Sequence, residues 1–108
     1  MSYNVQLTDN FIREAKKLAK KYASLPAELA ELGKELSENP MMGTPLGNDV
    51  YKIRLSIASK GKGKSGGARI ISFVKIIDKT VYLVSIYSKG DKETISSKEI
   101  EALLKGYI

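Results

Sequence analysis

The chain has 108 residues, a length that suits one folded domain, and 43% of them are hydrophobic, which argues against a disordered chain. It contains no cysteine and no histidine, which excludes disulfide bonds, a zinc site built on thiolate or imidazole, and a histidine-based catalytic triad. The first residues lack the basic and apolar regions of a signal peptide, and no apolar run reaches the roughly 20 residues of a membrane-spanning helix. We therefore expect one domain over residues 1–108 that is cytoplasmic, contacts no membrane and uses no metal or cofactor.

The positive charge of the chain is concentrated in one segment. The formal net charge is +6, from 18 Lys and Arg against 12 Asp and Glu, and no carboxylate lies between Asp49 and Asp78. The cations of that stretch are Lys52, Arg54, Lys60, Lys62, Lys64, Arg69 and Lys75. Such a segment attracts a polyanion such as RNA. The alternative is that these lysines keep a strand edge soluble, although lysines with that role are usually interleaved with acids.

The N-terminal half predicts a short strand followed by two amphipathic helices. Residues 3–7 alternate apolar and polar side chains, as in a strand, and Thr8 or Asp9 can cap the helix that follows. Apolar residues then recur every three or four positions, at Phe11, Ala15, Leu18 and Tyr22 and again at Leu25, Leu29, Leu32 and Leu36. Pro26 marks the start of the second helix and Asn39 its end. The remaining faces are typical of solvated surface, basic in the first helix and acidic in the second, where Glu28, Glu31 and Glu35 lie.

The C-terminal half predicts three strands and a short helix. In residues 50–58 alternate side chains face the helices, while Lys52, Arg54 and Ser56 point to the open face of the sheet. A loop rich in glycine and lysine follows, and residues 68–77 and 80–87 continue the meander. Ser96 and Glu99 form a capping box for the last helix. With residues 41–48 as a loop, this order predicts an α+β fold. We expect an antiparallel sheet, made of the N-terminal strand and the three-strand meander, with a helical hairpin and a short C-terminal helix on one face.

The basic segment can perform phosphate chemistry without a metal or a histidine. Arginine binds two phosphate oxygens through its planar fork and stabilises the charge that builds up during attack. RNA brings its own nucleophile, the 2′-hydroxyl, so a protein can cleave it by aligning that group and neutralising the phosphate. A lysine close to other cations holds its proton less tightly, which makes Lys52, beside Arg54, the candidate proton acceptor. Residues 63–65 read Gly-Lys-Ser, but they do not complete a nucleotide-binding loop, because the first glycine of that motif is missing and a strand follows instead of a helix.

Three stretches of the chain resemble the RelE superfamily of bacterial toxin–antitoxin toxins. They are residues 51–55 (YKIRL), 61–71 (GKGKSGGARII) and 86–89 (IYSK). The long glycine-lysine loop is most similar to the HigB-like branch. The resemblance implies a microbial-RNase-like fold and a metal-independent endoribonuclease, an mRNA interferase that cuts mRNA on the ribosome and inhibits translation. It also implies a cognate antitoxin, often a helix-turn-helix protein, that covers the basic site.

The resemblance carries over to individual residues. It implies catalytic roles for Lys52, Arg54, Arg69 and Lys89, with Arg69 matching the arginine that grips the scissile phosphate. We expect further contacts to RNA from Lys60, Lys62, Lys64, Lys75, Tyr87 and Lys92, although a tyrosine that ends a strand, such as Tyr87, is more often a packing residue. Gly90 stands where better-known members have an arginine, and Ser96 where they have a tyrosine. The general acid is therefore not assigned.

Two other functions stay open at this point. Some relatives with this fold act on DNA gyrase, so the chain could be a toxin with a protein target, and it could also be a non-catalytic RNA-binding module. Convergence of Lys52, Arg54 and Arg69 on one phosphate would favour cleavage. Side chains of Arg54 and Arg69 on opposite faces of the sheet would argue against it.

Overall fold

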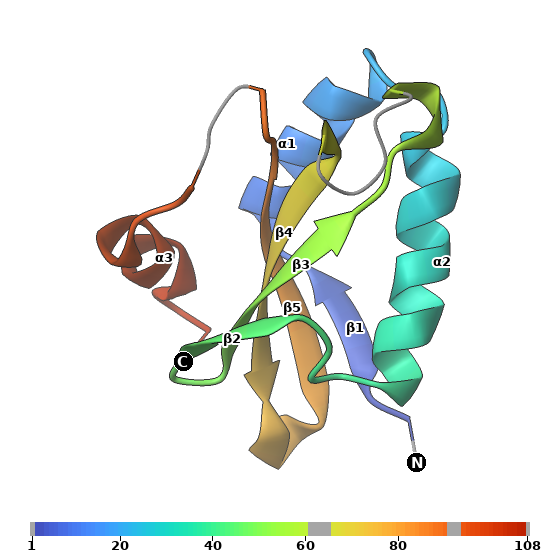
Figure 1. Cartoon of the computed structure of the whole chain (residues 1–108). Coiled ribbons are helices and arrows are strands. Elements are labelled where there is room, and N and C mark those ends of the chain that lie inside the picture. Colours follow the sequence, from blue (N-terminus) through green and yellow to red (C-terminus); the bar gives the residue numbers. More distant parts are fainter. Residues whose placement is uncertain (1, 61–65, 91–93, 108) are drawn as a thin grey trace.

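A computed structural model of the chain describes residues 2–60, 66–90 and 94–107. In these ranges a five-stranded sheet has the order β1-β5-β4-β3-β2. The strands are β1 (Asn4–Leu7), β2 (Thr44–Gly47), β3 (Val50–Leu55), β4 (Ala68–Lys75) and β5 (Thr80–Ser88). The helices are α1 (Asp9–Ala19), α2 (Leu25–Glu38) and α3 (Ser97–Leu104). Figure 1 shows the sheet between α3 on one side and the α1–α2 pair on the other. No helix within the described ranges is both long enough and apolar enough to cross a membrane.

The predicted meander is confirmed, since β4 pairs antiparallel with both β3 and β5. Two other predictions for the sheet are wrong. Strand β1 runs parallel to β5 at one edge, so the sheet is mixed. Residues 44–47, expected in a loop, form β2 and pair with β3 at the other edge. The hairpin turns at Asn48 (φ 54) and Asp49 (φ 64), whose positive φ values belong to the tight two-residue turn that suits a twisted hairpin.

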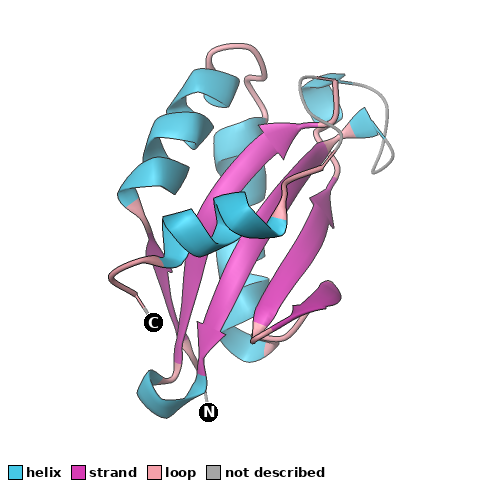
Figure 2. Ribbon diagram, turned by 90° about the vertical axis from the view of Figure 1, so that its left-hand side faces the viewer, coloured by secondary structure: helices cyan, strands magenta, loops and turns pink. Residues whose placement is uncertain are grey.

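The sequence predicted all three helices on one face of the sheet, and this prediction is wrong. Helices α1 and α2 pack on one face, over Ile53, Ile70 and Ile86, while α3 packs on the other, over Ile71 and Val84. Figure 2 shows α3 crossing one face of the sheet, with the α1–α2 helical hairpin behind it. The reason lies in β4, where every residue from its start to Val74 is buried. A strand that is apolar on both faces needs cover on both.

Local signals at the helix ends are confirmed. The backbone N–H of Phe11 donates to the hydroxyl of Thr8 at 3.2 Å, so Thr8 is the N-cap of α1. Ser96 and Glu99 form the predicted capping box of α3. These signals could be read from sequence because donor and acceptor lie only three residues apart.

Helix α1 completes the edge of β5 beyond the end of β1. The side-chain amide of Asn10 donates to the carbonyl oxygen of Val84 at 3.0 Å. Oε1 of Glu14 accepts from the Ser85 hydroxyl at 2.9 Å and from the backbone N–H of Ile86 at 3.3 Å. Polar side chains thus replace a neighbouring strand on this edge, which fixes α1 to the sheet.

Gly33 offers a test of the α2 packing. A Cβ built at this helical position meets nothing within 4 Å, and alanine favours a helix interior over glycine. We expect Gly33→Ala to raise the free energy of unfolding by about 0.5–1 kcal/mol in urea denaturation. A loss of stability would show that α2 lies closer to its neighbours than the structure places it.

Candidate RNA-binding and catalytic site

The sheet register brings the two predicted arginines together. Arg54 on β3 lies directly opposite Arg69 on β4, and Arg69 lies opposite Tyr87 on β5. Directly opposed residues share a face and have Cα atoms about 4.5–5.5 Å apart. We call Arg54, Arg69 and Tyr87 the cross-strand row. Lys52 is two residues before Arg54 and so shares its face. The arrangement that would have argued against cleavage, with the arginines on opposite faces, does not occur.

The members of this group differ in exposure. Arg54 is exposed and Lys52 is half-buried, whereas Arg69 is only 5% exposed. Nη1 of Arg69 donates to the carbonyl oxygen of Ala68 at 3.3 Å. Burying a charged group costs desolvation free energy unless polar atoms compensate it. The surrounding core therefore fixes the position of the Arg69 side chain, whereas the Arg54 side chain is exposed to solvent. Two guanidinium groups in adjacent strands, with a lysine beside them, can neutralise one phosphate together.

Tyr87 belongs to the apolar layer beneath α3. It is 6% exposed and packs in a cluster with Ile95, Ile100 and Leu104. A ring with so little free surface does not offer its face to a base, so the geometry favours packing over base stacking. The face that carries the cations is accordingly only partly open, because α3 covers the rest of it.

Lys89 lies at the same end of the sheet as the cross-strand row. It follows β5 directly, is exposed, and donates its backbone N–H to the carbonyl oxygen of Gly67 at 3.3 Å, next to the start of β4. The backbone of Lys60 is in a short 3-10 turn after β3. Its side chain, together with Lys62, Lys64 and Lys92, lies outside what the structure describes.

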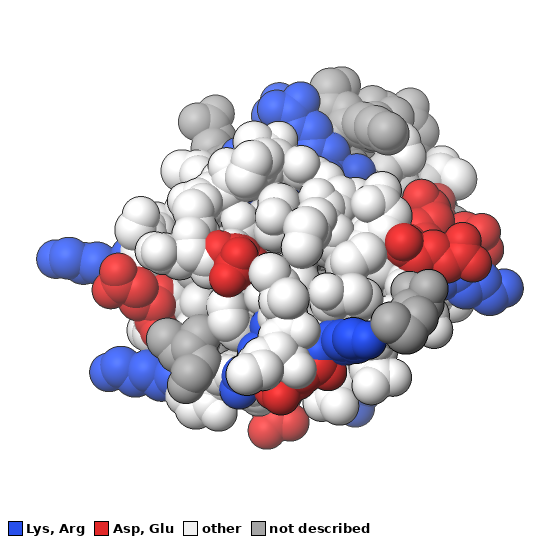
Figure 3. Space-filling model, turned by 90° about the horizontal axis from the view of Figure 1, so that it is seen from below, with Lys and Arg blue, Asp and Glu red and all other residues white. Residues whose placement is uncertain are grey.

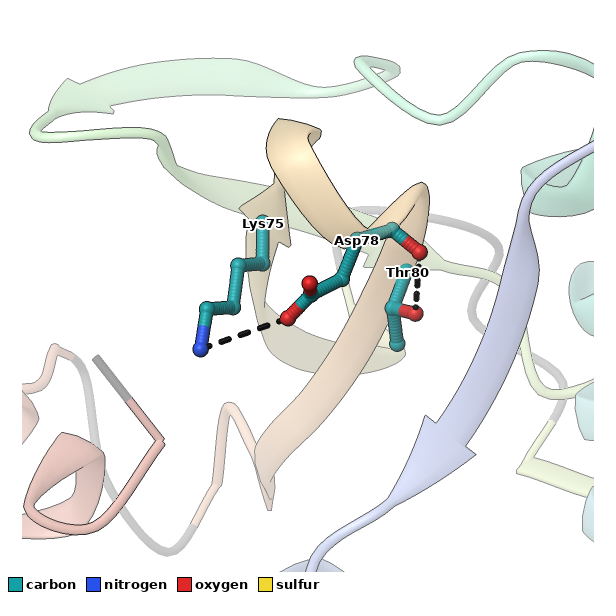
Figure 4. A network of polar contacts seen from close by, with 3 residues as sticks. All are labelled: Lys75, Asp78 and Thr80. Atoms are coloured by element: carbon teal, nitrogen blue, oxygen red, sulfur yellow. Dashed lines mark hydrogen bonds and ion pairs between the residues drawn. The ribbon is translucent and has the colours of Figure 1, made fainter.

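Lys75 lies at the opposite end of the sheet. It lies six positions after Arg69 in β4, roughly 20 Å away in an extended strand. Its Nζ is 3.3 Å from Oδ2 of Asp78, and the Thr80 hydroxyl donates to the carbonyl oxygen of Asp78 at 3.0 Å (Figure 4). Figure 3 views the molecule from below, the end where Ile77 is 87% exposed, and cationic side chains there are scattered among acidic ones. We therefore do not group Lys75 with the cations of the cross-strand row.

The family model of the RelE toxin of the RelE/RelB toxin–antitoxin system matches residues 3–106. The chain belongs to the RelE toxin family. A mutant of E. coli RelE in the free state has a similar structure, with TM-score 0.66, 20% identity and 100% of both chains covered. The RelBE2 toxin–antitoxin complex of Mycobacterium tuberculosis matches with TM-score 0.59 and 20% identity, over 82% of this chain and 99% of that chain. E. coli mutant RelE bound to an antitoxin RelBc peptide matches with TM-score 0.61 and 20% identity, over 100% of this chain and 99% of that one.

These comparisons confirm the resemblance and the fold drawn from it. At 20% identity the similarity to solved structures shows the fold alone. Membership of the family rests on the match to the family model. The assignment to a HigB-like branch stays a prediction. In this RelE-family toxin Ser96, at the position where the resemblance suggests a tyrosine, is the N-cap of α3.

Three residues that position the segment after β3 were not identified from the sequence. Glu28 was expected on a solvated helix face, yet its Oε2 accepts from the backbone N–H of Ala58 at 2.7 Å. The hydroxyl groups of Ser24 and Ser59 lie 2.8 Å apart. These bonds tie the start of α2 to the chain just after β3 and its Arg54. No local pattern indicates them, because the partners are 30 and 35 residues apart.

Gly43, directly before β2, packs closely against the backbone of β3. Its φ is +101°, and a Cβ there would lie 2.6 Å from the carbonyl oxygen of Lys52 and 2.9 Å from Cγ1 of Ile53. Only a residue without a side chain fits such an approach. The backbone at Lys52 therefore depends on glycine at position 43.

We expect Gly43→Ala to destabilise the toxin by about 1–3 kcal/mol and to shift the amide resonances of β3, because both the backbone angle and the contact with Lys52 become strained. The matched control is Gly47→Ala, where φ is +94° but nothing lies within 4 Å of the added Cβ. Urea denaturation of the two variants separates the angle from the contact. Equal losses would mean that the approach to Lys52 is unimportant.

Proposed function

We propose that this RelE-family toxin is a metal-independent endoribonuclease that cuts mRNA on the ribosome and so inhibits translation. The observation that carries the proposal is the pairing of Arg54 with Arg69 on one face of the sheet, with Lys52 on the same face. Three cations on one face of two adjacent strands suit a phosphate group better than they suit a solvated surface, where like charges are usually separated by acids.

The proposed reaction uses the RNA's own nucleophile. The 2′-oxygen forms a bond to the adjacent phosphorus while the bond from phosphorus to the 5′-oxygen breaks, which leaves a 2′,3′-cyclic phosphate and a 5′-hydroxyl end. Lys52 is the candidate acceptor of the 2′-hydroxyl proton. Arg54 and Arg69 stabilise the charge that develops on the phosphate oxygens. The group that protonates the leaving 5′-oxygen is not assigned, and Lys89 is the exposed cation nearest to the row along β5.

The proposed partners are the ribosome, mRNA and a cognate antitoxin. Among the similar structures are RelE proteins solved in complex with an antitoxin or an antitoxin peptide, which supports an antitoxin for this chain. We expect it to be a helix-turn-helix protein, as the resemblance implies. We place the RNA contact at the end of the sheet that carries the cross-strand row.

Primer extension on an mRNA translated in a purified system tests the cleavage. We expect cuts within the translated frame that need ribosomes, and a loss of roughly 10²–10³-fold in rate for Arg54→Ala, the size seen when one transition-state contact is removed. Arg54→Ala is the decisive variant because Arg54 is exposed and its loss leaves the core intact. Arg54→Ala/Arg69→Ala should be inactive as well.

Lys75→Ala is the matched control, since it removes a cation of the same sheet at its far end and should keep full activity. Intact mRNA with the wild-type toxin would contradict the proposal, and inhibition of DNA gyrase would then be measured. Equal losses for Arg54→Ala and Lys75→Ala would mean that total charge, and not the cross-strand row, matters.

A further inference from the structure

Helix α1 and the turn after it carry a second group of cations, away from the cross-strand row. All five are exposed, and we call them the α1 cationic face: Arg13, Lys16, Lys17, Lys20 and Lys21. The two acids of the helix do not neutralise them. Asp9 lies in the first turn, and Glu14 turns toward β5, where it accepts hydrogen bonds from Ser85 and Ile86.

The cations of this face lie close enough together to repel one another. Arg13 and Lys17, Lys16 and Lys20, and Lys17 and Lys21 are pairs four residues apart, and like charges at that spacing repel. The helix dipole favours cations at the C-terminal end, where Lys16 and Lys17 lie in the last turn and Lys20 is the C-cap, but it does not favour Arg13 in the middle of the helix. None of the five forms an ion pair with a residue that the structure describes, and Arg13 donates to the side-chain oxygen of Asn10. Solubility alone would be served as well by lysines interleaved with acids.

The α1 cationic face reaches the end of the molecule where the candidate site lies. Helix α1 ends next to the turn that contains Ser24, and Ser24 is hydrogen-bonded to Ser59 in the segment after β3. Strand β3 ends at Leu55, one residue beyond Arg54. In Figure 1 the α1–α2 turn and the ends of β3 and β5 lie together at the upper end of the molecule. Because α1 covers the face of the sheet opposite the cross-strand row, an RNA that meets both passes around this end of the molecule.

We infer that the α1 cationic face binds the phosphate backbone of double-helical RNA, as an anchor separate from the cleavage site. This deepens the proposed function and rests on it, since the ribosome is the expected source of such RNA. The face lacks the aromatic platform that proteins use for single strands, because Phe11 is 1% exposed and Tyr22 packs against the core. From Arg13 to Lys21 the cations extend about 12 Å along the helix. Backbone and shape are what proteins read in an RNA duplex.

The test compares two triple variants of the whole toxin that lose the same charge. The first is Lys16→Gln/Lys17→Gln/Lys20→Gln on α1. The control, Lys34→Gln/Lys98→Gln/Lys105→Gln, changes exposed lysines of α2 and of α3 with its C-terminal end, so both variants lose three of the formal charges that give +6. The probe is a fluorescent RNA hairpin with a stem of about 16 base pairs, titrated over a series of salt concentrations. Thermal melts by circular dichroism confirm that both variants are folded.

We expect the plot of log K against log salt to lose about 2–3 units of slope in the α1 variant, since each phosphate contact contributes roughly 0.7–0.9. The control should keep the wild-type slope. Equal changes in both variants would overturn the inference and leave only a general effect of net charge. Unchanged hairpin binding with weakened binding of the antitoxin would also overturn it and would assign the face to an acidic protein.

The anchor and the cleavage site can fail independently. Arg54→Ala should lower the cleavage rate by roughly 10²–10³-fold yet keep the hairpin-binding difference between the α1 variant and its control. If the wild-type toxin cleaves nothing but the α1 variant alone loses hairpin binding, the anchor stands and the proposed nuclease activity falls. If cleavage is confirmed and hairpin binding is the same in both triple variants, only the anchor falls.

Discussion

Strand β4 is the constraint on which the rest of the structure depends. It is buried on both faces from its start to Val74, so it requires the α1–α2 hairpin on one side and α3 on the other. Its pairing with β3 and β5 also sets the register of the three central strands. Because pairing by one residue more or less would turn each side chain to the opposite face, the apolar pattern of β4 fixes where Arg69 points.

The candidate site lies at one end of this buried strand, where burial and register fix the side-chain positions. Arg69 is a buried charged residue near the start of β4, and its neighbour Arg54 brings a second guanidinium group into the same row. Groups that bind a developing charge act best when they are already oriented before the reaction. The core thus holds Arg69 in place, and the exposed Arg54 lies beside it on β3.

The two ends of the molecule differ in surface chemistry. The cross-strand row, Lys89 and the α1–α2 turn gather at one end, where the contacts of Glu28 and Ser24 bind the start of α2 to the segment after β3. At the other end Lys75 is paired with Asp78, and Ile77 is exposed. The end with the cross-strand row is therefore the one where we propose that RNA binds.

The sequence by itself determined what depends on neighbours along the chain. Alternation in β3, the spacing of leucines in α2, the caps at Thr8 and Ser96, and the long stretch without acids are all local patterns, and the structure follows them. Only the tertiary structure decided the pairing of Arg54 with Arg69, the distance of Lys75 from them, the burial of Tyr87 beneath α3, and the role of Glu28. These depend on strand register and on which face each helix covers. Register and cover are set by packing between residues far apart in the chain, for which a single sequence carries no local signal.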